Sequence, residues 1–542
     1  MDIKRLLDVA HDLFSKKAPL NSLHQEIADN FYPERANFTL TRSLGTDFAA
    51  QLMTSYPVRC RRDLGNQFST MLRPTARPWF HIKRRYADNP NIESTEVKTY
   101  LEWFEETQRR AMYDRGALFT RATKEADHDY AAFGQCAVSI ELNKARNGLL
   151  YRCWHLRDMC WQEGDEGKVG FVARKWKPTA QVLAATFPGK VHEKVTQLLA
   201  KTPFEEVECM HLVVSAEMYD DDARGAPRWS LWYDVTHEKL MMATPLWGRH
   251  YIIPRWQTVS GSQYSYSPAT VCALPDARLL QAMTFTLLEA GEKATSPPII
   301  ATQNVVRSDV ALYAGGITWV DEEYDEKLGA ALRPLEQDFR GFNYGLQMNQ
   351  ETRAMLHSAF YLDALTLPQR APEMTAYEVG QRVQEYIRNA LPLFEPMEME
   401  YNAALCEETF FLLRRGGAFG APASWPKELQ NAEIEFAFES PLHDAIEQQK
   451  GQKFQEAQAL IGAAIALDPS CAYLPKTEVA LRDALMGVGI PATWMNTEAY
   501  VKEQRANQAA QQAKAQTLAN LEQASNVAKN VGQSGMVAPV AA

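Results

Sequence analysis

The 542-residue chain lacks the short motifs that common enzyme classes need. It has no GxxxxGK[ST] loop to cradle nucleotide phosphates, no HExxH zinc motif and no GxSxG nucleophile turn. These absences exclude P-loop nucleotide hydrolases, zinc proteases of the HExxH type and serine hydrolases with that turn. They do not exclude an enzyme whose catalytic residues lie far apart in the sequence.

Paired cysteines and long apolar runs are also missing. The eight cysteines form no CxxC pair, so we expect buried free thiols in a reducing compartment; they lie at positions 60, 136, 153, 160, 209, 272, 406 and 471. The apolar stretch Ala459–Leu467 is interrupted by Gly462 and is far too short for a membrane span. The N-terminus shows no signal-peptide core, and no membrane partner is expected.

An excess of basic charge is absent as well. The chain carries 57 basic and 67 acidic side chains, a net charge of −10, which argues against a protein that coats DNA. A local exception is the basic segment 59–85, with Arg59, Arg61, Arg62, Arg73, Arg77, Lys83, Arg84 and Arg85. This segment is either a contact for phosphates or an acidic partner, or a solvated surface paired with acidic neighbours.

Three clusters contain metal-ligand residue types without a metal-site pattern. Cys153, His155 and Cys160 have no second ligand pair nearby and fit an alternating strand. The Asp220–Gly225 segment begins like a calcium loop but then departs from the ligand pattern, which favours a solvated turn. The acidic run Asp321–Glu326 fits a solvated surface. No metal and no cofactor are therefore expected.

What is present is a globular composition with two kinds of periodicity. Hydrophobic residues make up 46% of the chain, and its length suggests three or four units. Three- and four-residue steps predict two helices over residues 2–32. Period-two alternation predicts strands between residues 135 and 256, at about 136–142, 149–154, 169–176, 207–214, 230–235 and 250–253. The predicted class is α+β.

The second half is predicted to be mainly helical. Helices are expected from Pro275 to about Ala290 and from about Gln337 to Phe360, separated by a short module with a β-like run at Ile299–Val306. A long helix over 376–415 should be kinked at its prolines and end at Gly416-Gly417. From Glu498 the chain is an Ala/Gln/Asn-rich helix with almost no apolar stripe.

The order of these parts and a set of local motifs resemble the head-to-tail connector, or portal, proteins of short-tailed double-stranded-DNA phages. The resemblance spans about residues 20–500, with Ser265 standing where the family pattern leads us to expect glycine. The motifs are 32–38 (YPERANF), 61–80 (RRDLGNQFSTMLRPTARPWF), 129–134 (DYAAFG), 254–256 (PRW), 267–268 (SP), 275–278 (PDAR) and 373–379 (EMTAYEV).

The resemblance implies a portal fold, mainly helical with an antiparallel β-rich wing segment, two stem helices around a small clip and a helical crown. The implied parts are the wing (1–273), first stem helix (274–295), clip (296–334), second stem helix (335–360), tunnel loop (361–375), long kinked wing helix (376–418), crown (419–500) and a C-terminal helical barrel or mobile tail (501–542). It also implies a ring, usually of twelve copies, at one capsid vertex, through which the genome is packaged and ejected.

Two sets of site residues follow from this resemblance. The tunnel-loop residues Leu367, Gln369, Arg370 and Glu373 are expected to face DNA in the channel. Pro368 and Pro372 break the helix there, and Thr375 with Glu378 forms a capping box that restarts it. Arg370 alternatively pairs with Glu373 or Asp363 in a simple connector. The clip residues Asp321, Glu322, Glu323, Asp325 and Glu326 are expected to dock partners.

The implied partners are those of a virion component. They are further copies of this chain, major capsid and scaffolding proteins, terminase, a tail adaptor protein, double-stranded DNA in the channel and internal ejection proteins at the crown. Assembly in the host cytoplasm is expected. The net charge of −10 is compatible with a channel wall that does not grip DNA. The alternatives are a ring-shaped tail adaptor, another non-enzymatic assembly protein, and an enzyme with dispersed catalytic residues; native mass separates a ring from a typical enzyme.

Overall fold

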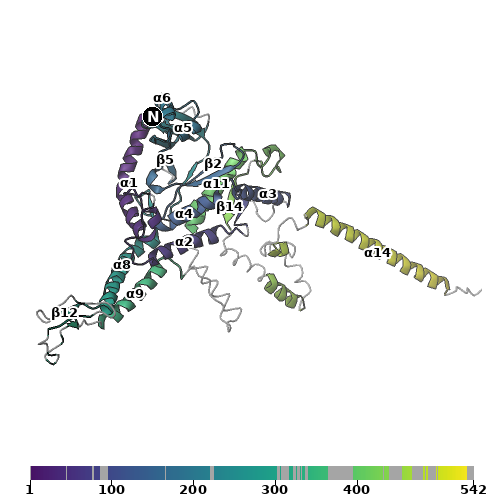
Figure 1. Ribbon diagram of the computed structural model, residues 1–542. Coiled ribbons are helices and arrows are strands. Elements are labelled where there is room, and N and C mark those ends of the chain that lie inside the picture. Colours follow the sequence, from purple (N-terminus) through teal and green to yellow (C-terminus); the bar gives the residue numbers. More distant parts are fainter. Residues whose placement is uncertain are drawn as a thin grey trace, which may run out of the picture. The chain divides into compact units, whose positions relative to one another are not determined.

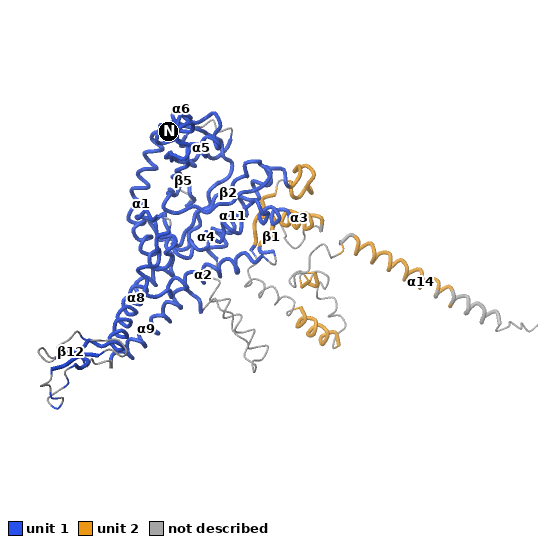
Figure 2. Tube along the Cα trace, in the orientation of Figure 1, with its two compact units in different colours: residues 1–79, 107–418, 438–442 blue, residues 80–106, 419–437, 443–542 orange. Residues whose placement is uncertain are grey.

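The fold comprises two compact units, each with its own packing. A computed structural model describes residues 2–43, 45–75, 78–85, 95–164, 167–219, 225–301, 306, 310, 317–321, 325, 327, 330, 332–335, 340–363, 395–430, 432–438, 454–466, 480–482, 484–485, 496 and 498–533. One unit contains residues 1–79, 107–418 and 438–442, and the other contains residues 80–106, 419–437 and 443–542 (Figure 2).

The larger unit combines helices with antiparallel sheets, which confirms the predicted α+β class (Figure 1). Its longer helices are α1 (Ile3–Phe31), α2 (Tyr56–Leu72), α4 (Phe119–Phe133), α8 (Pro268–Thr295), α9 (Arg340–Ala359) and α11 (Ala403–Arg415). Its short helices are η1 (Pro33–Arg35), η3 (Leu156–Asp158), α5 (Ala180–Thr186), α6 (Glu193–Lys201), α7 (Ala216–Tyr219) and the π-helix η5 (Glu398–Asn402).

Two sheets form the β-rich segment. The five-stranded sheet has the order β4 (Met159–Glu163), β5 (Val169–Trp176), β6 (Cys209–Ser215), β7 (Arg228–Asp234), β8 (Lys239–Leu246). The three-stranded sheet has the order β3 (Leu149–Cys153), β2 (Val138–Leu142), β9 (Tyr251–Ile252). A small pair joins β10 (Gln257–Thr258) to β11 (Ser265–Tyr266). The sequence predicted β2, β3, β5, β6, β7 and β9 but not β4, β8, β10 or β11. It also did not predict the helices α2, α4, α5, α6 and α7.

Strand register separates the five-stranded sheet into two different faces. On one face, Ala173 pairs with Leu212 and Leu212 with Leu231, and α1 covers this apolar row with Leu6, Ala10 and Leu13. The other face carries Arg174 opposite His211, which in turn lies opposite Trp232. Tyr251 of β9 hydrogen-bonds both Arg174 and His211, so this second face is a polar and aromatic layer between the two sheets.

Helix α1 is continuous, so the prediction of two helices over residues 2–32 is wrong. Pro19 lies inside the helix although it lacks a backbone donor. Both halves are held by tertiary packing. The first half lies on the sheet, and in the second half the ring of His24 packs 4.9 Å from that of Phe133 in α4. Packing on either side of Pro19 thus overrides the local helix-breaking signal.

Lys17 joins α1 to the edge of the sheet without a carboxylate partner. Its Nζ donates hydrogen bonds to the backbone carbonyls of Leu156 (2.6 Å) and Met159 (2.8 Å). The same ammonium lies 5.1 Å from the ring of Trp161 and 5.5 Å from that of Tyr264. Burial lowers the pKa of Lys17 to about 7.

The two long helices α8 and α9 extend away from the sheets as a hairpin (Figure 1). Helix α8 begins at Pro268, capped by Ser267, so the predicted helix start at Pro275 is wrong. The Ser-Pro pair is itself a helix-start signal, and Pro275 is accommodated inside the helix. At the far end, β12 (Ile299–Ala301) pairs with β13 (Leu332–Pro334), and Val306 forms an isolated bridge with Val320. Residues 302–305 of the predicted β-like run lie outside the described residues.

The described end of the long predicted helix is irregular. The π-helix Glu398–Asn402 follows Pro396 and continues into α11, which ends at Gly416 as predicted. Residues 364–394 lie outside the described part of the chain. Of the seven cysteines within the described residues, five are buried and Cys153 is half-buried, whereas Cys272 on α8 is exposed, contrary to the expectation of buried thiols.

The smaller unit has a sheet pair, an aromatic cluster and a long terminal helix. Strand β1 (Phe80–Arg84) pairs with β14 (Ile434–Phe438), and the helix α3 (Thr95–Met112) begins in this unit. The ring of Phe104 lies 4.9 Å from both Phe419 and Trp425, near the short helix η6 (Pro422–Ser424). The predicted C-terminal helix is confirmed as α14 (Glu498–Gln533).

We predict that Lys17→Met changes stability in a pH-dependent way. An unfolded lysine titrates near its ordinary pKa of 10.5, whereas buried Lys17 titrates near 7. Between these values the unfolded state binds more protons, so Lys17 contributes increasingly to stability as pH rises from 7 to 10.5, by at most about 1.4 kcal/mol per pH unit. In denaturant unfolding, the free energy of unfolding of the wild type relative to that of Lys17→Met should be larger at pH 9 than at pH 6.5.

The matched control is Lys16→Met, because Lys16 is exposed and pairs with Asp12 at the helix surface. Its effect on the free energy of unfolding should be small at both pH values. A Lys17→Met difference that stays constant or falls as pH rises would contradict the assignment.

Candidate functional site

Helix α4 is the position where the motifs of the sequence meet. Ten of its residues are buried, among them Asp127, Asp129 and Tyr130. The helix contacts α1, α2, α8 and strands β2 and β3. Buried charges on a helix surrounded by so many elements need partners of opposite charge on those elements.

The first buried charge on α4 is paired with the end of α2. Arg73 donates hydrogen bonds to Asp127 and to Asn402 Oδ1 (2.8 Å) of the π-helix. The side chains of Arg73 and Asp127 are 2% and 0% exposed. The Arg73 guanidinium also lies 4.7 Å from the ring of Tyr401. Burial raises the pKa of Asp127, while Arg73 opposes this rise. This ion pair therefore fixes α2 and the π-helix against α4.

The second buried charge is paired with the segment after α1. Arg35 forms a bidentate ion pair with Asp129, with Nε–Oδ1 at 3.0 Å and Nη2–Oδ2 at 2.6 Å. Burial alone would lower the pKa of Arg35, but Asp129 raises it above its ordinary value. The carboxylate of Asp129 lies 3.8 Å from Cys153 Sγ.

Arg61 of α2 makes the third polar contact. It donates to the backbone carbonyl of Phe31 (3.1 Å) and to His128 Nδ1 (3.1 Å), and lies 3.7 Å from the ring of Tyr32. Burial and the nearby Arg61 lower the pKa of His128 to about 4. Gly65 permits this packing, because a Cβ there would lie 2.3 Å from His128 Nδ1.

The start of α8 is bonded to the end of α4 by three hydroxyl groups. Ser267 Oγ donates to the carbonyl of Ala131 (2.7 Å), Thr270 Oγ1 to that of Ala132 (2.8 Å) and Ser265 Oγ to that of Gly134. The carbonyls of Ala131 and Ala132 belong to the last turn of α4, where the helix itself supplies no donors for them. Ser265, which departs from the family pattern, thus supplies one of these contacts.

Gly134 makes this close approach feasible. Its φ is +69°, and a Cβ would lie 2.1 Å from the backbone carbon of Tyr266 and 2.2 Å from the nitrogen of Ser267. Trp256 completes the junction by stacking on Tyr130 with ring centroids 5.6 Å apart. We call α4 and these partners the α4 junction. It joins five of the seven sequence motifs.

The basic segment 59–85 is explained in part by this junction. Arg61 and Arg73 are buried and bonded within the protein, so neither is the predicted phosphate contact, nor are they solvated. Arg84 and Arg85 lie within 4.0 and 3.6 Å of Glu428 and Glu433, as expected for paired surface charges. Arg77 lies outside the described residues.

The predicted site residues are only partly within the described chain. Leu367, Gln369, Arg370 and Glu373 lie outside it, as do Glu322, Glu323 and Glu326. Asp321 and Asp325 are described, and Asp325 Oδ1 accepts a hydrogen bond from the backbone of Lys327 (3.0 Å). The roles of both sets therefore stay predictions.

The suspected metal-ligand residues have separate partners. Cys153 lies near Asp129, His155 hydrogen-bonds Asn37, and Cys160 Sγ lies 3.9 Å from the carbonyl of Ala10. Within the described ranges, no group of three or more histidine, cysteine or acidic side chains is arranged to hold a metal ion. The segment 220–224 is not among the described residues.

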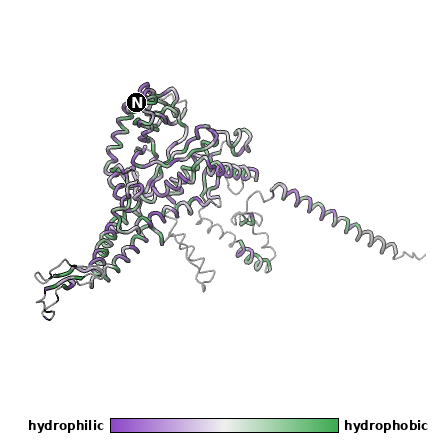
Figure 3. Tube along the Cα trace, in the orientation of Figure 1, coloured by the Kyte–Doolittle hydropathy of each residue, from purple (hydrophilic) through white to green (hydrophobic). Residues whose placement is uncertain are grey.

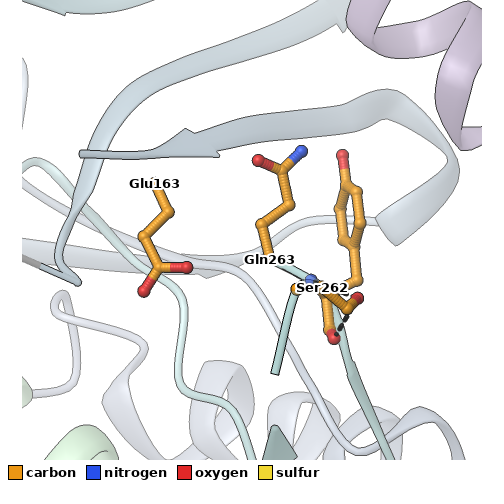
Figure 4. A pocket seen from close by; sticks show the side chains of 5 residues that line it. Glu163, Ser262 and Gln263 are labelled. Atoms are coloured by element: carbon orange, nitrogen blue, oxygen red, sulfur yellow. Dashed lines mark hydrogen bonds between the residues drawn. The ribbon is translucent and has the colours of Figure 1, made fainter. Parts of the chain in front are cut away.

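An open hollow lies beside the sheet, at the end of β4 (Figure 4). It is lined by Glu163, Gly261, Ser262, Gln263 and Tyr264. Glu163 is paired with Arg255 at 3.1 Å, and Ser262 bonds the backbone of Tyr264. The carboxylate of Glu163 is thus already paired with Arg255, and nothing in the arrangement of the lining residues points to a reaction.

The α4 junction yields a testable prediction about its buried ion pair. Removing one partner of Arg73–Asp127 leaves a buried unpaired charge, which costs about 3–5 kcal/mol of unfolding free energy. Arg73→Met and Asp127→Leu should each be strongly destabilising, and the double variant should cost clearly less than their sum. Denaturant unfolding of the wild type, the two single variants and the double variant measures this coupling energy.

The same helix provides the control. Arg121 and Glu125 form an exposed ion pair on α4, with a distance of 3.1 Å. The corresponding cycle, with Arg121→Met and Glu125→Leu, should give a coupling below about 0.5 kcal/mol. Equal couplings in the two cycles would show that the buried pair has no special role.

Comparison with known proteins gives one family. A family model described as bacteriophage head to tail connecting protein matches residues 4–495. The chain is 24% identical over 458 residues to a probable portal protein of Bordetella phage BPP-1 and 20% identical over 458 residues to a portal protein of Salmonella phage epsilon15. Each match covers 82% of this chain and 79% of the relative.

Among solved structures, the chain is similar to one from the virion of a native gene transfer agent particle. The TM-score is 0.36 at 9% identity, with 78% of this chain and 91% of the other covered.

The match to the family model confirms the resemblance seen in the sequence motifs. It spans both the α4 junction and the α8–α9 hairpin. In the part of the chain that the structure describes, no helix combines the length and apolar character needed to cross a bilayer. The chain therefore belongs to the family of bacteriophage head to tail connecting proteins, which have a structural role in the phage particle.

Proposed function

We propose that the chain assembles into a closed ring of about twelve copies at one capsid vertex. The ring forms the channel for genome packaging and ejection and the docking platform for terminase and tail. The observation that carries this proposal is the α8–α9 hairpin, which exposes large apolar side chains along its length. Both hydrophobic and hydrophilic residues occur along the trace of this hairpin (Figure 3). Large exposed apolar surfaces often mark contacts with other proteins.

The inner faces of the hairpin are already satisfied within one chain. Asn349 Nδ2 donates to Thr284 Oγ1 at 3.2 Å, and Gly345 lies directly against Leu287. The remaining apolar side chains point elsewhere. They are Val271, Leu279, Phe285 and Leu288 on α8, and Tyr344, Leu346, Met348 and Met355 on α9. Neighbouring copies in a ring would cover them.

In this proposal, the hairpin is the stem, and the region around β12 and β13 is the clip. Ile317 and Trp319 in that region are about two-thirds exposed, which suits a surface that meets partner proteins. The acidic residues Asp321, Glu322, Glu323, Asp325 and Glu326 would steer the association of terminase and later of the tail adaptor. The β-rich segment and its helices form the wing toward capsid and scaffolding proteins.

The C-terminal part is proposed to be the crown and an appended helical element. Helix α14 exposes Leu518 and Leu521, but has few other large apolar residues. An isolated helix of this composition has no stripe to bury. It would gain partners from neighbouring copies in a barrel inside the head, where internal ejection proteins also bind.

The ring predicts a specific effect of charge on the exposed face of α9. Met348→Glu should place a carboxylate in a contact between copies, and rings should give way to monomers or small oligomers in native mass spectrometry. The matched control is Gln347→Glu, a change at the adjacent exposed position, which points away from α8 and should leave rings intact. A wild-type chain that forms no ring would overturn the proposed function.

The tunnel loop predicts an effect on DNA rather than on assembly. Arg370→Glu should leave rings and procapsids normal while reducing the yield or retention of packaged DNA, because twelve positive charges facing the phosphates become negative. Arg370→Lys keeps the charge and should package normally. Wild-type packaging and retention in Arg370→Glu would leave only the role of a connector for this loop.

A further inference from the structure

The loop between η1 and α2 is fixed at both ends by glutamine side chains. Gln25 of α1 accepts hydrogen bonds from the backbone N–H groups of Phe38 (2.8 Å) and Thr39 (3.1 Å). Gln281 of α8 accepts from those of Met53 (2.7 Å) and Thr54 (3.0 Å). Gln281 also donates to the carbonyl of Thr54 at 3.0 Å. We call residues 39–43 and 45–54 the strap.

The strap is held firmly but exposes apolar side chains. Arg42 pairs with Asp29 of α1 at 2.8 Å and lies 6.0 Å from the ring of Phe48. Leu40, Phe48 and Met53 are nevertheless 56%, 42% and 39% exposed. Backbone anchoring of a loop that turns its apolar groups outward favours an interaction surface over a simple connection.

The strap is continuous with one side of α8. Gln281, Phe285 and Leu288 are spaced i, i+4 and i+7, so they lie on one side of the helix. Phe285 and Leu288 are exposed. Because Gln281 holds the strap at Met53, the apolar surface of the strap extends that of α8.

The exposed face of α9 lies on the other side of the hairpin. Arg353 marks the strap side of α9, since its guanidinium lies 5.6 Å from the ring of Tyr56, two residues after Thr54. Tyr344, Met348 and Met355 are about 140–180° around the helix from Arg353, at 100° per residue. All three are exposed.

We propose that copies in the ring associate through a heterologous contact, in which the strap and the Phe285–Leu288 face of α8 cover the Tyr344, Met348 and Met355 face of α9 in the next copy. The proposal rests on the proposed ring. In a two-fold dimer the same surface patch of each copy forms the contact, so one such contact cannot cover two apolar faces on opposite sides of the hairpin. A head-to-tail contact that closes into a ring covers both in every copy.

Chemical cross-linking tests which faces meet. In a Cys272→Ser background, which removes the exposed thiol on α8, we consider Met53→Cys on the strap and Met348→Cys on α9. With a short bismaleimide, the doubly substituted chain should yield a ladder of multimers up to the ring size. Co-assembled singly substituted chains should yield dimers only, and each single variant alone should yield no cross-linked product above the background chain.

Three outcomes would overturn the proposal in distinguishable ways. Dimers from Met348→Cys alone would show that α9 meets α9. Rings that yield no ladder from the double variant would refute the strap contact while leaving the ring itself in place. If the chain forms no ring, the proposed function fails, and this proposal fails with it.

A second measurement addresses the anchoring role of Gln281. Gln281→Met keeps the size of the side chain but removes the three hydrogen bonds to the strap. Rings of this variant should dissociate at lower urea concentration than the wild type, whereas Gln347→Met on the exposed side of α9 should not shift dissociation. If rings of both variants dissociate at the same urea concentration, anchoring of the strap by Gln281 does not support the contact between copies.

Discussion

Asp127 and Asp129 on one buried helix constrain most of the larger unit. Each carboxylate is removed from water and must be matched by a guanidinium, because an unpaired buried charge would cost several kcal/mol of stability. Arg73 reaches Asp127 from the end of α2, and Arg35 reaches Asp129 from the segment after α1. The positions of α1, α2 and the π-helix therefore depend on α4. Apolar packing alone would allow these helices to slide more freely than paired charges do.

The hydroxyl contacts at the end of α4 extend this constraint to the α8–α9 hairpin. Ser265, Ser267 and Thr270 bind carbonyls of α4, so the base of α8 is tied to the helix that carries the ion pairs. A force applied to the hairpin would reach the sheets through these short bonds. For a family with a structural role in the phage particle, this rigidity is a more relevant property than a cleft or a catalytic group.

The sequence motifs located this junction better than they located its chemistry. Arg61 and Arg73 stood out as part of a basic segment and suggested a contact with phosphates or acidic partners. In the structure both are buried, and their partners, His128 and Asp127, are about 60 residues away in the sequence. Composition could not distinguish an exposed arginine from a buried one, because burial depends on which distant segment covers it.

The sequence by itself determined the α+β class, most strands, the two-helix hairpin and the family, because periodicity and short motifs are local properties of the chain. It did not determine the continuity of α1 through Pro19 or the buried state of Lys17. Those depend on packing between segments distant in the sequence, whose free energy exceeds local propensity. The two opposite apolar faces of the hairpin likewise emerged only from the tertiary structure, since the inner faces of α8 and α9 must be known before the outer ones can be assigned.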